Sequence, residues 1–341
     1  MSRNLFQYDP VIGYRFVPGL KGRVRHEGGG YLVRCNNAGF RSDHVFRDAP
    51  TPGKRRVLVF GDSNTAGDGV SNGKRFSDLI EAQLPDCEVY NFGLPSSGTD
   101  QQYLAFRECA GAMHYDLLLL CPMVDNIRRN LQDARLIHSG LSGELALLPK
   151  PYFDLAQGAL VLRNVPVPKG HLPVDNAQAD EPQIGSVRAL ARQAMSHANA
   201  RFPGLRGWTQ WLRRLALPAE YNSPNTLGWQ LMRTILAQWI AEARAPVILA
   251  PIPTFEHIDG NIRAAPYRAR FAELSRETGA ALVDVLDGLR AQNATRPGSL
   301  RFPTDEHPTV AGHAAIAELL VPHVARALEG GLSNPMQMSA E

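Results

Sequence analysis

The chain has 341 residues, of which 44% are hydrophobic and 20% are charged, a composition typical of ordinary globular proteins. Its formal net charge of +3 gives no strong field toward nucleic acid or a membrane surface, so we expect neither as a partner. No run reaches the roughly 18 apolar residues of a membrane-spanning helix. The first ten residues lack the apolar centre of a secretory signal. We therefore expect a cytoplasmic protein without a membrane span.

Cysteines and paired arginines give little functional signal. The four cysteines, Cys35, Cys87, Cys109 and Cys121, lie far apart and form no CxxC pair. We expect buried free thiols rather than disulfides or metal ligands. The arginine pairs at 128–129 and 213–214 are typical of solvated helix faces, and we interpret them in that way.

The predicted elements fall into a short opening segment and a longer alternating region. Residues 1–52 are rich in turns with short alternating stretches, which predicts a small β-rich segment. Residues 53–330 then alternate apolar runs with helical spacings. The apolar runs predict buried parallel strands at 57–60, 87–93, 116–123, 246–253 and 281–285. Apolar residues three or four apart predict helices at 73–84, from about 99, at 226–244, 264–277 and about 309–328.

This strand–helix alternation predicts a doubly wound parallel sheet, in which ligands bind beyond the carboxyl ends of the strands. Residues 131–224 interrupt the alternation with sequence rich in Pro and Gly, and we interpret them as an insertion. Within the insertion, 207–217 has the spacing of an amphipathic helix. We expect this helix to pack on the main domain, with a cap over the active site as the alternative. Residues 331–341 are expected to form a flexible tail.

The strongest chemical signal follows the first predicted strand, in VLVFGDSNTAGDGV over 57–70. Ser63 comes just past the carboxyl end of that strand, at the edge where this architecture places its site. Small neighbours allow a sharp turn that leaves the hydroxyl accessible. The chain lacks the GxSxG elbow of α/β-hydrolases. It also has neither a GxxxxGK[ST] loop nor a GxGxxG loop after the first strand, which argues against nucleotide binding. By itself, the pattern fits a loop serine that caps a helix at least as well as a nucleophile.

The segment PTDEHPTVAGH over 303–313 supplies the groups that a serine nucleophile needs. Serine requires a base, usually histidine, and the base requires a third group that orients it. In an extended turn, Asp305 can reach Nδ1 of His307 and leave Nε2 facing Ser63. The alternatives are a surface Asp and His, or a metal site made of Asp305, His307 and His313. No further cluster completes a metal site, so we expect neither metal nor cofactor, and we expect His313 to hydrogen bond locally.

Three motifs together resemble the SGNH (GDSL-type) hydrolase family of esterases and acyltransferases: GDS at 61–63, NFGLP at 91–95, and DEHP followed by GH at 305–313. The opening stretches YDPVIGYRFVPG and NNAGFRSD resemble the N-terminal segment of bacterial members. The resemblance implies a flavodoxin-like three-layer α/β/α sandwich. It implies Ser63 as nucleophile, His307 as base and Asp305 as orienting acid. It also implies that the backbone N–H groups of Ser63 and Gly93 bind the oxyanion, and a glycine suits such a close approach.

The family's third motif departs from its usual form in this chain. The family has Gly-x-Asn-Asp after the third strand, and its Asn is an oxyanion donor. Here the sequence is PMVDN over 122–126, with Asp125 counted at the Asn position and Asn126 one residue later. An ionised Asp125 would repel an oxyanion, and losing one donor costs about 2.7–4 kcal/mol in the barrier. There are three possibilities. A bulge brings Asn126 into the hole, a protonated Asp125 donates instead, or the site has another role. We expect the first, or a hole of two donors.

The resemblance implies an enzyme that removes a small, acetyl-like acyl group from a hydroxylated substrate through an acyl-serine intermediate. We expect the partner to be a small-molecule or carbohydrate ester, such as a sugar or glycan precursor. One alternative is an acyltransferase that uses the same Ser-His-Asp site. The other is a non-catalytic glycan-binding protein, which would have no need of Ser63, Asp305 and His307 together.

Overall fold

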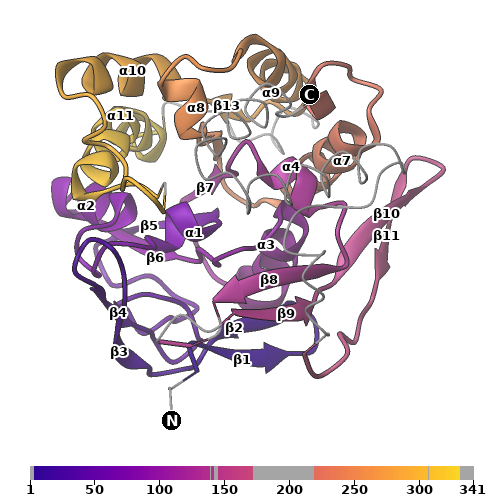
Figure 1. Ribbon diagram of the computed structural model, residues 1–341, viewed down its shortest axis with the longest axis horizontal. Coiled ribbons are helices and arrows are strands. Elements are labelled where there is room, and N and C mark those ends of the chain that lie inside the picture. Colours follow the sequence, from indigo (N-terminus) through magenta and orange to yellow (C-terminus); the bar gives the residue numbers. More distant parts are fainter. Residues whose placement is uncertain (1–3, 139, 142–144, 172–218, 306, 331–341) are drawn as a thin grey trace, which may run out of the picture.

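The computed structural model describes residues 4–138, 140–141, 145–171, 219–305 and 307–330. At its centre lies a five-stranded parallel sheet (Figure 1). Its strands are β5 (Arg55–Gly61), β6 (Cys87–Asn91), β7 (Leu117–Cys121), β12 (Val247–Leu249) and β13 (Ala281–Leu282). Each strand coincides with one of the predicted apolar runs. The predicted α/β fold with a central parallel sheet is therefore confirmed.

The strand order, β6–β5–β7–β12–β13, determines where a site can form. β6 pairs with one side of β5 and β7 pairs with the other side. The chain therefore leaves β5 in one direction and returns to its opposite side. Loops diverge at such a point and leave a crevice beyond the carboxyl ends of the strands. The loops after β5 and β7 border this crevice.

Right-handed crossovers set the side of the sheet on which each helix lies. α2 (Phe76–Gln83) connects β5 to β6, and α3 (Thr99–Ala105) connects β6 back to β7, so these helices cover opposite faces. α11 (Val310–Leu328) packs along α2, while α7 (Leu227–Glu242) packs against α3 and α9 (Ala265–Thr278). Because both faces are covered, every residue of β7 is buried. This explains why the central strands were apolar along their whole length.

Short helical segments occupy the connections. They are α1 (Ser63–Ala66), a π-helical turn (Phe106–Ala110), α4 (Asn126–Arg129), a 3-10 turn (Ala219–Tyr221), α8 (Phe255–Ile258) and α10 (Leu286–Thr295). Among the described residues, no helix has the length and apolar character needed to cross a membrane. The four cysteines are free thiols; Cys109 is partly exposed and the other three are buried.

Four antiparallel hairpins lie outside the central sheet. They pair β1 (Phe6–Asp9) with β2 (Gly13–Phe16), β3 (Lys21–Val24) with β4 (Tyr31–Arg34), β8 (Ala134–His138) with β9 (Leu145–Pro149), and β10 (Tyr152–Ala156) with β11 (Ala159–Arg163). The first two belong to the predicted N-terminal segment and the last two to the predicted insertion. Figure 1 shows β8 and β9 beside β1 and β2, and a backbone bridge between Asn4 and Gly140 joins the two regions.

A buried ion pair ties the insertion to the main domain. Lys150, just after β9, contacts the carboxylate of Asp100 in α3, and both side chains are fully buried. Its ammonium also donates to the backbone oxygens of Arg129 and Gln132. The predicted helix over 207–217 and the tail over 331–341 lie outside the described residues.

Candidate active site

Ser63 lies at the carboxyl edge of the sheet, where α1 begins after β5. The chain turns tightly there, because a Cβ on Gly61 would lie 2.0 Å from Thr65 Oγ1 and 2.8 Å from the backbone oxygen of Cys121. Asp62 caps α1 by accepting a hydrogen bond from the N–H of Asn64 at 3.0 Å. This turn holds Ser63 as the first residue of α1, at the crevice.

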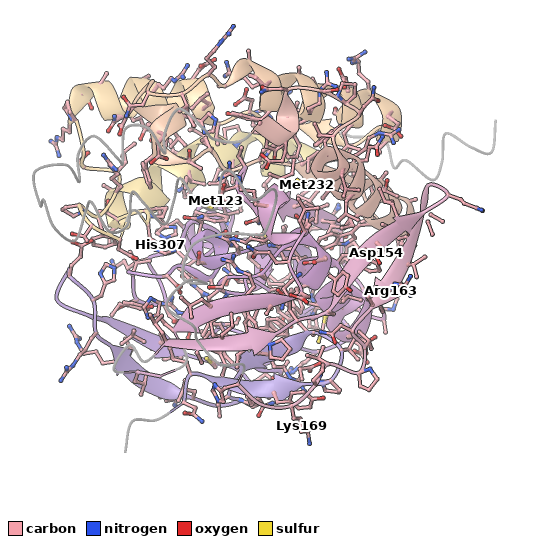
Figure 2. The ribbon with its side chains drawn as sticks, turned by 45° about the vertical axis from the view of Figure 1, so that its right-hand side comes forward. Met123, Asp154, Arg163, Lys169, Met232 and His307 are labelled. Carbon is pink, nitrogen blue, oxygen red and sulfur yellow. The ribbon has the colours of Figure 1, made fainter. Side chains whose placement is uncertain are left out.

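Three side chains form a continuous hydrogen-bonded chain at this edge. His307 Nε2 lies 2.8 Å from Ser63 Oγ, and His307 Nδ1 lies 2.7 Å from Asp305 Oδ2. An ionised carboxylate only accepts, so Nδ1 carries the proton and Nε2 accepts from the serine hydroxyl. This is the geometry that a general base and its orienting acid require. His307 lies on the same side of the molecule as Met123, which follows β7 (Figure 2).

Opposing effects set the pKa values of the base and its acid. Burial lowers the pKa of His307, but the hydrogen bond to Asp305 and the carboxylates of Asp68, Asp305 and Asp62 raise it above its ordinary value of 6.5. Burial acts to raise the pKa of Asp305, whereas its hydrogen bonds to His307 and His26 and their charges lower it to about 2. Asp305 is thus ionised at neutral pH and can stabilise an imidazolium at His307.

A narrow turn before α11 places Asp305 and His307 together. The N–H of Phe302 donates to the backbone oxygen of His307, and the N–H of Thr309 donates to that of Leu300, both at 3.0 Å. Thr309 then caps α11 through its side chain. These bonds pair the two arms of the loop and explain how residues two apart in sequence form one hydrogen-bonded unit.

The predicted oxyanion donors differ in their environments. The N–H of Ser63 makes no hydrogen bond within the described part of the chain. The N–H of Gly93, in contrast, donates to Asn91 Oδ1 at 2.7 Å, which contradicts the expectation that it faces an oxyanion. A Cβ on Gly93 would lie 2.2 Å from the backbone nitrogen of Ala66. The glycine is therefore required for close packing beneath α1.

The third motif supplies no accessible donor in this conformation. The side chain of Asn126 is fully buried, and its amide nitrogen and oxygen have no partner among the described residues. Asp125 lies 3.9 Å from Arg128 and makes an ion pair with it, which argues against a protonated donor. The residue that approaches the nucleophile loop is Met123, whose sulfur lies 3.2 Å from Asn64 Nδ2. A role of Asn126 in the hole therefore stays a prediction.

Ser96, which sequence reasoning missed, stands out in the loop after β6. It has φ = 60°, a left-handed conformation that is uncommon for a residue other than glycine. Its N–H makes no hydrogen bond within the described residues, while its backbone oxygen accepts from Arg135 Nε at 3.2 Å. Backbone strain of this kind concentrates at functional sites, which makes the Ser96 N–H a candidate second donor. Serine carries no sequence signal for this conformation, so only the fold reveals it.

Arg129 supports the nucleophile loop, and our interpretation of it as part of a solvated helix face was wrong. Its Nη1 donates to Asp62 Oδ2 at 2.9 Å and to the backbone oxygen of Ser97 at 3.1 Å. The side chain of Asp62 is 0% exposed and that of Arg129 is 13% exposed. The pair thus neutralises a buried carboxylate next to Ser63 and joins the loops after β5 and β6.

The alternative metal site receives no support from the geometry. His313 is fully buried, and its Nδ1 accepts a hydrogen bond from the N–H of Phe76 at 3.2 Å. Among the described residues, no group of three His, Cys, Asp or Glu side chains is arranged to hold a metal ion. His313 therefore has a structural role, but its hydrogen bond reaches α2, 237 residues away in sequence, and is not the local one that we expected.

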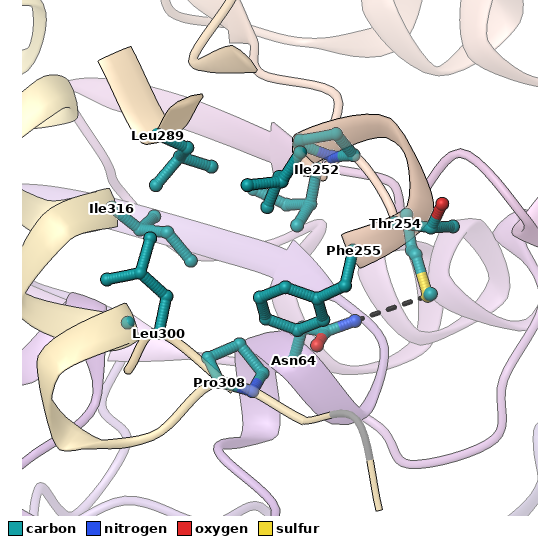
Figure 3. Close-up of a pocket in the computed structure, with 12 residues that line it drawn as sticks. Asn64, Ile252, Thr254, Phe255, Leu289, Leu300, Pro308 and Ile316 are labelled. Atoms are coloured by element: carbon teal, nitrogen blue, oxygen red, sulfur yellow. Dashed lines mark hydrogen bonds between the residues drawn. The ribbon is translucent and has the colours of Figure 1, made fainter. Parts of the chain in front are cut away.

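A small, mainly apolar cavity lies beside the candidate triad (Figure 3). Asn64 and Pro308, the neighbours of Ser63 and His307 in sequence, form part of its wall. The other lining residues are Met123, Ile252, Pro253, Thr254, Phe255, Ile258, Leu289, Leu300, Gly312 and Ile316. The lining suits the apolar part of a substrate.

No protein-family model and no curated protein matches the chain. Solved structures do match. A lipolytic protein of the G-D-S-L family from Veillonella parvula is 12% identical, with 80% of this chain and 99% of that chain covered and a TM-score of 0.43. A lipase/acylhydrolase from Enterococcus faecalis is 13% identical, with 82% of this chain and 98% of that chain covered and a TM-score of 0.42. A catalytic mutant of an acetylxylan esterase from Geobacillus stearothermophilus is 14% identical, with 80% of this chain and 95% of that chain covered and a TM-score of 0.43.

Proposed function

We propose that the protein is a serine esterase that cleaves a carboxylic ester through an acyl-enzyme on Ser63. The observation that carries this proposal is the hydrogen-bonded chain from Ser63 Oγ through His307 to Asp305, with distances of 2.8 Å and 2.7 Å. A nucleophile within reach of a base that is itself oriented by a carboxylate is the arrangement that acyl transfer needs. A protein that only binds glycans would gain nothing from it.

The reaction begins when Ser63 Oγ attacks the ester carbonyl carbon and its proton passes to His307 Nε2. The carbonyl oxygen becomes an oxyanion that the N–H of Ser63 can stabilise, and Ser96 is the candidate for a second donor. Collapse of this intermediate breaks the ester C–O bond, and the leaving alkoxide takes the proton from Nε2. Water then gives a proton to His307 Nε2 and attacks the acyl carbon. The bond between that carbon and Ser63 Oγ breaks, Ser63 Oγ takes the proton back from Nε2, and the carboxylic acid leaves. Asp305 stays ionised throughout and holds the imidazolium in place.

The substrate we propose is a hydroxylated compound, such as a sugar or glycan precursor, that carries a small acyl group. The resemblance of the sequence motifs to the SGNH family motivates the sugar. The cavity beside Asn64 and Pro308 bears on the acyl group, since it offers mainly apolar walls next to the proposed nucleophile. A series of p-nitrophenyl esters from acetate to octanoate measures which acyl length the site accepts.

Covalent labelling tests the proposal. A fluorophosphonate probe reacts with an activated serine, so we expect labelling of the native protein and none of Ser63→Ala. Ser275→Ala is a matched control, because within the described part of the chain this hydroxyl on α9 donates only to the backbone oxygen of Ala280. We expect Ser63→Ala to lower kcat for ester hydrolysis by about 10⁴-fold or more. Absence of labelling in the native protein would refute the proposal.

Product analysis separates hydrolysis from transfer. Both reactions pass through the same acyl-serine and differ only in whether water or another hydroxyl accepts the acyl group. We expect free acid to dominate when the esterase works in the presence of a sugar or an alcohol. If acylated sugar or alcohol dominates instead, the protein is an acyltransferase with the same nucleophile.

A further inference from the structure

A histidine from the N-terminal segment contacts the candidate triad. His26 lies in the turn between β3 and β4, 279 residues before Asp305 in sequence. Its Nε2 lies 2.7 Å from Asp305 Oδ2. The same carboxylate oxygen lies 2.7 Å from His307 Nδ1. Two imidazoles therefore share one oxygen of the orienting acid.

The hydrogen bonds of His26 define which of its nitrogens carries the proton. The N–H of Gly28 points to His26 Nδ1 at a distance of 3.1 Å. A ring nitrogen that accepts from a backbone N–H must present its lone pair, so the proton is on Nε2. Nε2 then donates to the carboxylate of Asp305, which can only accept. The turn thus fixes His26 in the tautomer that donates to Asp305.

The ring of His26 is also held in place by packing. It makes edge contacts with Phe302, at 4.4 Å between centroids, and with Tyr31, at 5.7 Å. A Cβ on Gly69, in the loop after α1, would lie 3.3 Å from His26 Cε1 and 2.5 Å from Phe302. Only 10% of the His26 side chain is exposed. The imidazole therefore has little freedom to rotate away from Asp305.

Glu27, the next residue, holds the backbone of the same loop. Its carboxylate accepts from the N–H of Asp305 at 2.8 Å and from the N–H of Thr304 at 3.0 Å. These bonds lower the pKa of Glu27, so its carboxylate stays ionised as an acceptor. The turn of the hairpin thus binds the loop twice, through the backbone by Glu27 and through the Asp305 side chain by His26. Asp305 needs such support because 35% of its side chain is exposed on a loop.

We propose that His26 is a positioning residue of the active site. Its Nε2–H fixes the Asp305 carboxylate in the orientation that holds His307 toward Ser63. The N-terminal segment is then a part of the catalytic apparatus and not a separate appendage. This inference rests on the proposed esterase function. It predicts that the site loses efficiency without His26 although the Ser63, His307 and Asp305 side chains all remain.

The test compares two replacements of His26. His26→Phe keeps an aromatic ring against Phe302 and Tyr31 but removes the donor, while His26→Gln keeps an N–H₂ donor. Loss of a side chain that orients a metal ligand typically lowers affinity or activity by about 10- to 100-fold. We expect a loss of similar size here, so His26→Phe should slow fluorophosphonate labelling and ester hydrolysis by about 10- to 100-fold. His26→Gln should stay within about threefold of the native protein. His44→Phe is the matched control, since it removes another histidine–carboxylate contact of the same segment, with Glu81 at 2.8 Å.

The pH dependence separates positioning from a loss of stability. The carboxylates that act on His307 are those of Asp305, Asp68 and Asp62, and the charge of His307 also acts on the buried His313 of α11. If Asp305 turns away in His26→Phe, the bond that raises the pKa of His307 is lost, and the rising limb of kcat/KM moves to lower pH. A variant that is only less stable keeps the limb in place. An unchanged limb, or one that moves to higher pH, would overturn the proposal. Should His26→Phe not fold, His26→Asn, whose amide is too short to reach Asp305, takes its place.

A readout without substrate distinguishes this inference from the esterase function. The Nδ1 proton between His307 and Asp305 gives a low-field NMR resonance, which we expect in the native protein and in His26→Gln but not in His26→Phe. If the native protein is neither labelled nor hydrolytic, the esterase proposal fails while this resonance still tests the role of His26. If the resonance persists in His26→Phe, His26 does not position Asp305, whatever the activity.

Discussion

Replacing Arg129 by Met should destabilise the protein strongly, because it leaves a buried carboxylate unpaired. Asp62 is 0% exposed, and its Oδ2 accepts from Arg129 Nη1 at 2.9 Å. Removing one partner of a buried pair costs about 3–5 kcal/mol. Asp62 Oδ1 keeps its bond from the N–H of Asn64, and Arg129 is 13% exposed. We therefore expect a loss near the lower end, about 3 kcal/mol in the free energy of unfolding.

Urea unfolding of three variants measures this effect. Arg129→Met gives the cost of the unpaired charge, and the double variant Asp62→Asn/Arg129→Met removes that charge and should recover part of the loss. Asn can still cap α1. The control is Arg233→Met, which breaks an ion pair with Glu277 whose side chains are 44% and 40% exposed. We expect the control to cost no more than about 1 kcal/mol. A loss below 1 kcal/mol for Arg129→Met, or no recovery in the double variant, would refute this account of the pair.

Three further predictions concern the candidate site itself. Because carboxylates raise the pKa of His307 above 6.5, the pH–rate profile of kcat/KM should rise through a midpoint above 6.5. Asp68→Asn removes one of those carboxylates and should move that midpoint to lower pH. Ser96→Gly should keep ester hydrolysis and raise the free energy of unfolding in urea by up to about 1 kcal/mol, since glycine adopts φ = 60° without strain; a loss of stability would contradict the strain. Ile316→Trp should narrow the apolar cavity and lower kcat/KM for octanoate esters far more than for acetate esters; equal losses for both would show that the acyl chain does not enter the cavity.

The central sheet could be predicted from the sequence because its burial is two-sided. Strands such as β7, which are buried at every position, must be apolar throughout, and such runs are visible without knowledge of their partners. The prediction of Ser63, Asp305 and His307 was possible for a related reason. The edge of a parallel sheet fixes where the loop after β5 lies, and a spacing of two residues fixes how Asp305 can meet His307.

The remaining parts of the site depend on contacts that no local pattern encodes. Gly93 was expected to be an oxyanion donor because it has no side chain. The absence of a side chain instead allows α1 to pack closely against it. Arg129 follows another arginine, which favours a surface position, and only the fold shows that it donates to the buried carboxylate of Asp62. His26 reaches Asp305 across 279 residues of sequence. For Arg129 and His26 the partner is distant in sequence, so residue type and spacing carry no information about it.

The charges around Ser63 suggest why both Arg129 and His26 are present. His307 is close to three carboxylates, those of Asp62, Asp68 and Asp305, which stabilise an imidazolium but repel an oxyanion. Arg129 compensates the negative charge of Asp62, and the N–H of His26 partly compensates that of Asp305. Asp68 has no such donor among the contacts described above, and burial raises its pKa. A site built in this way favours the charged state of the base and limits the repulsion that the oxyanion experiences. Weakening either donor should therefore raise the barrier even where the triad geometry survives.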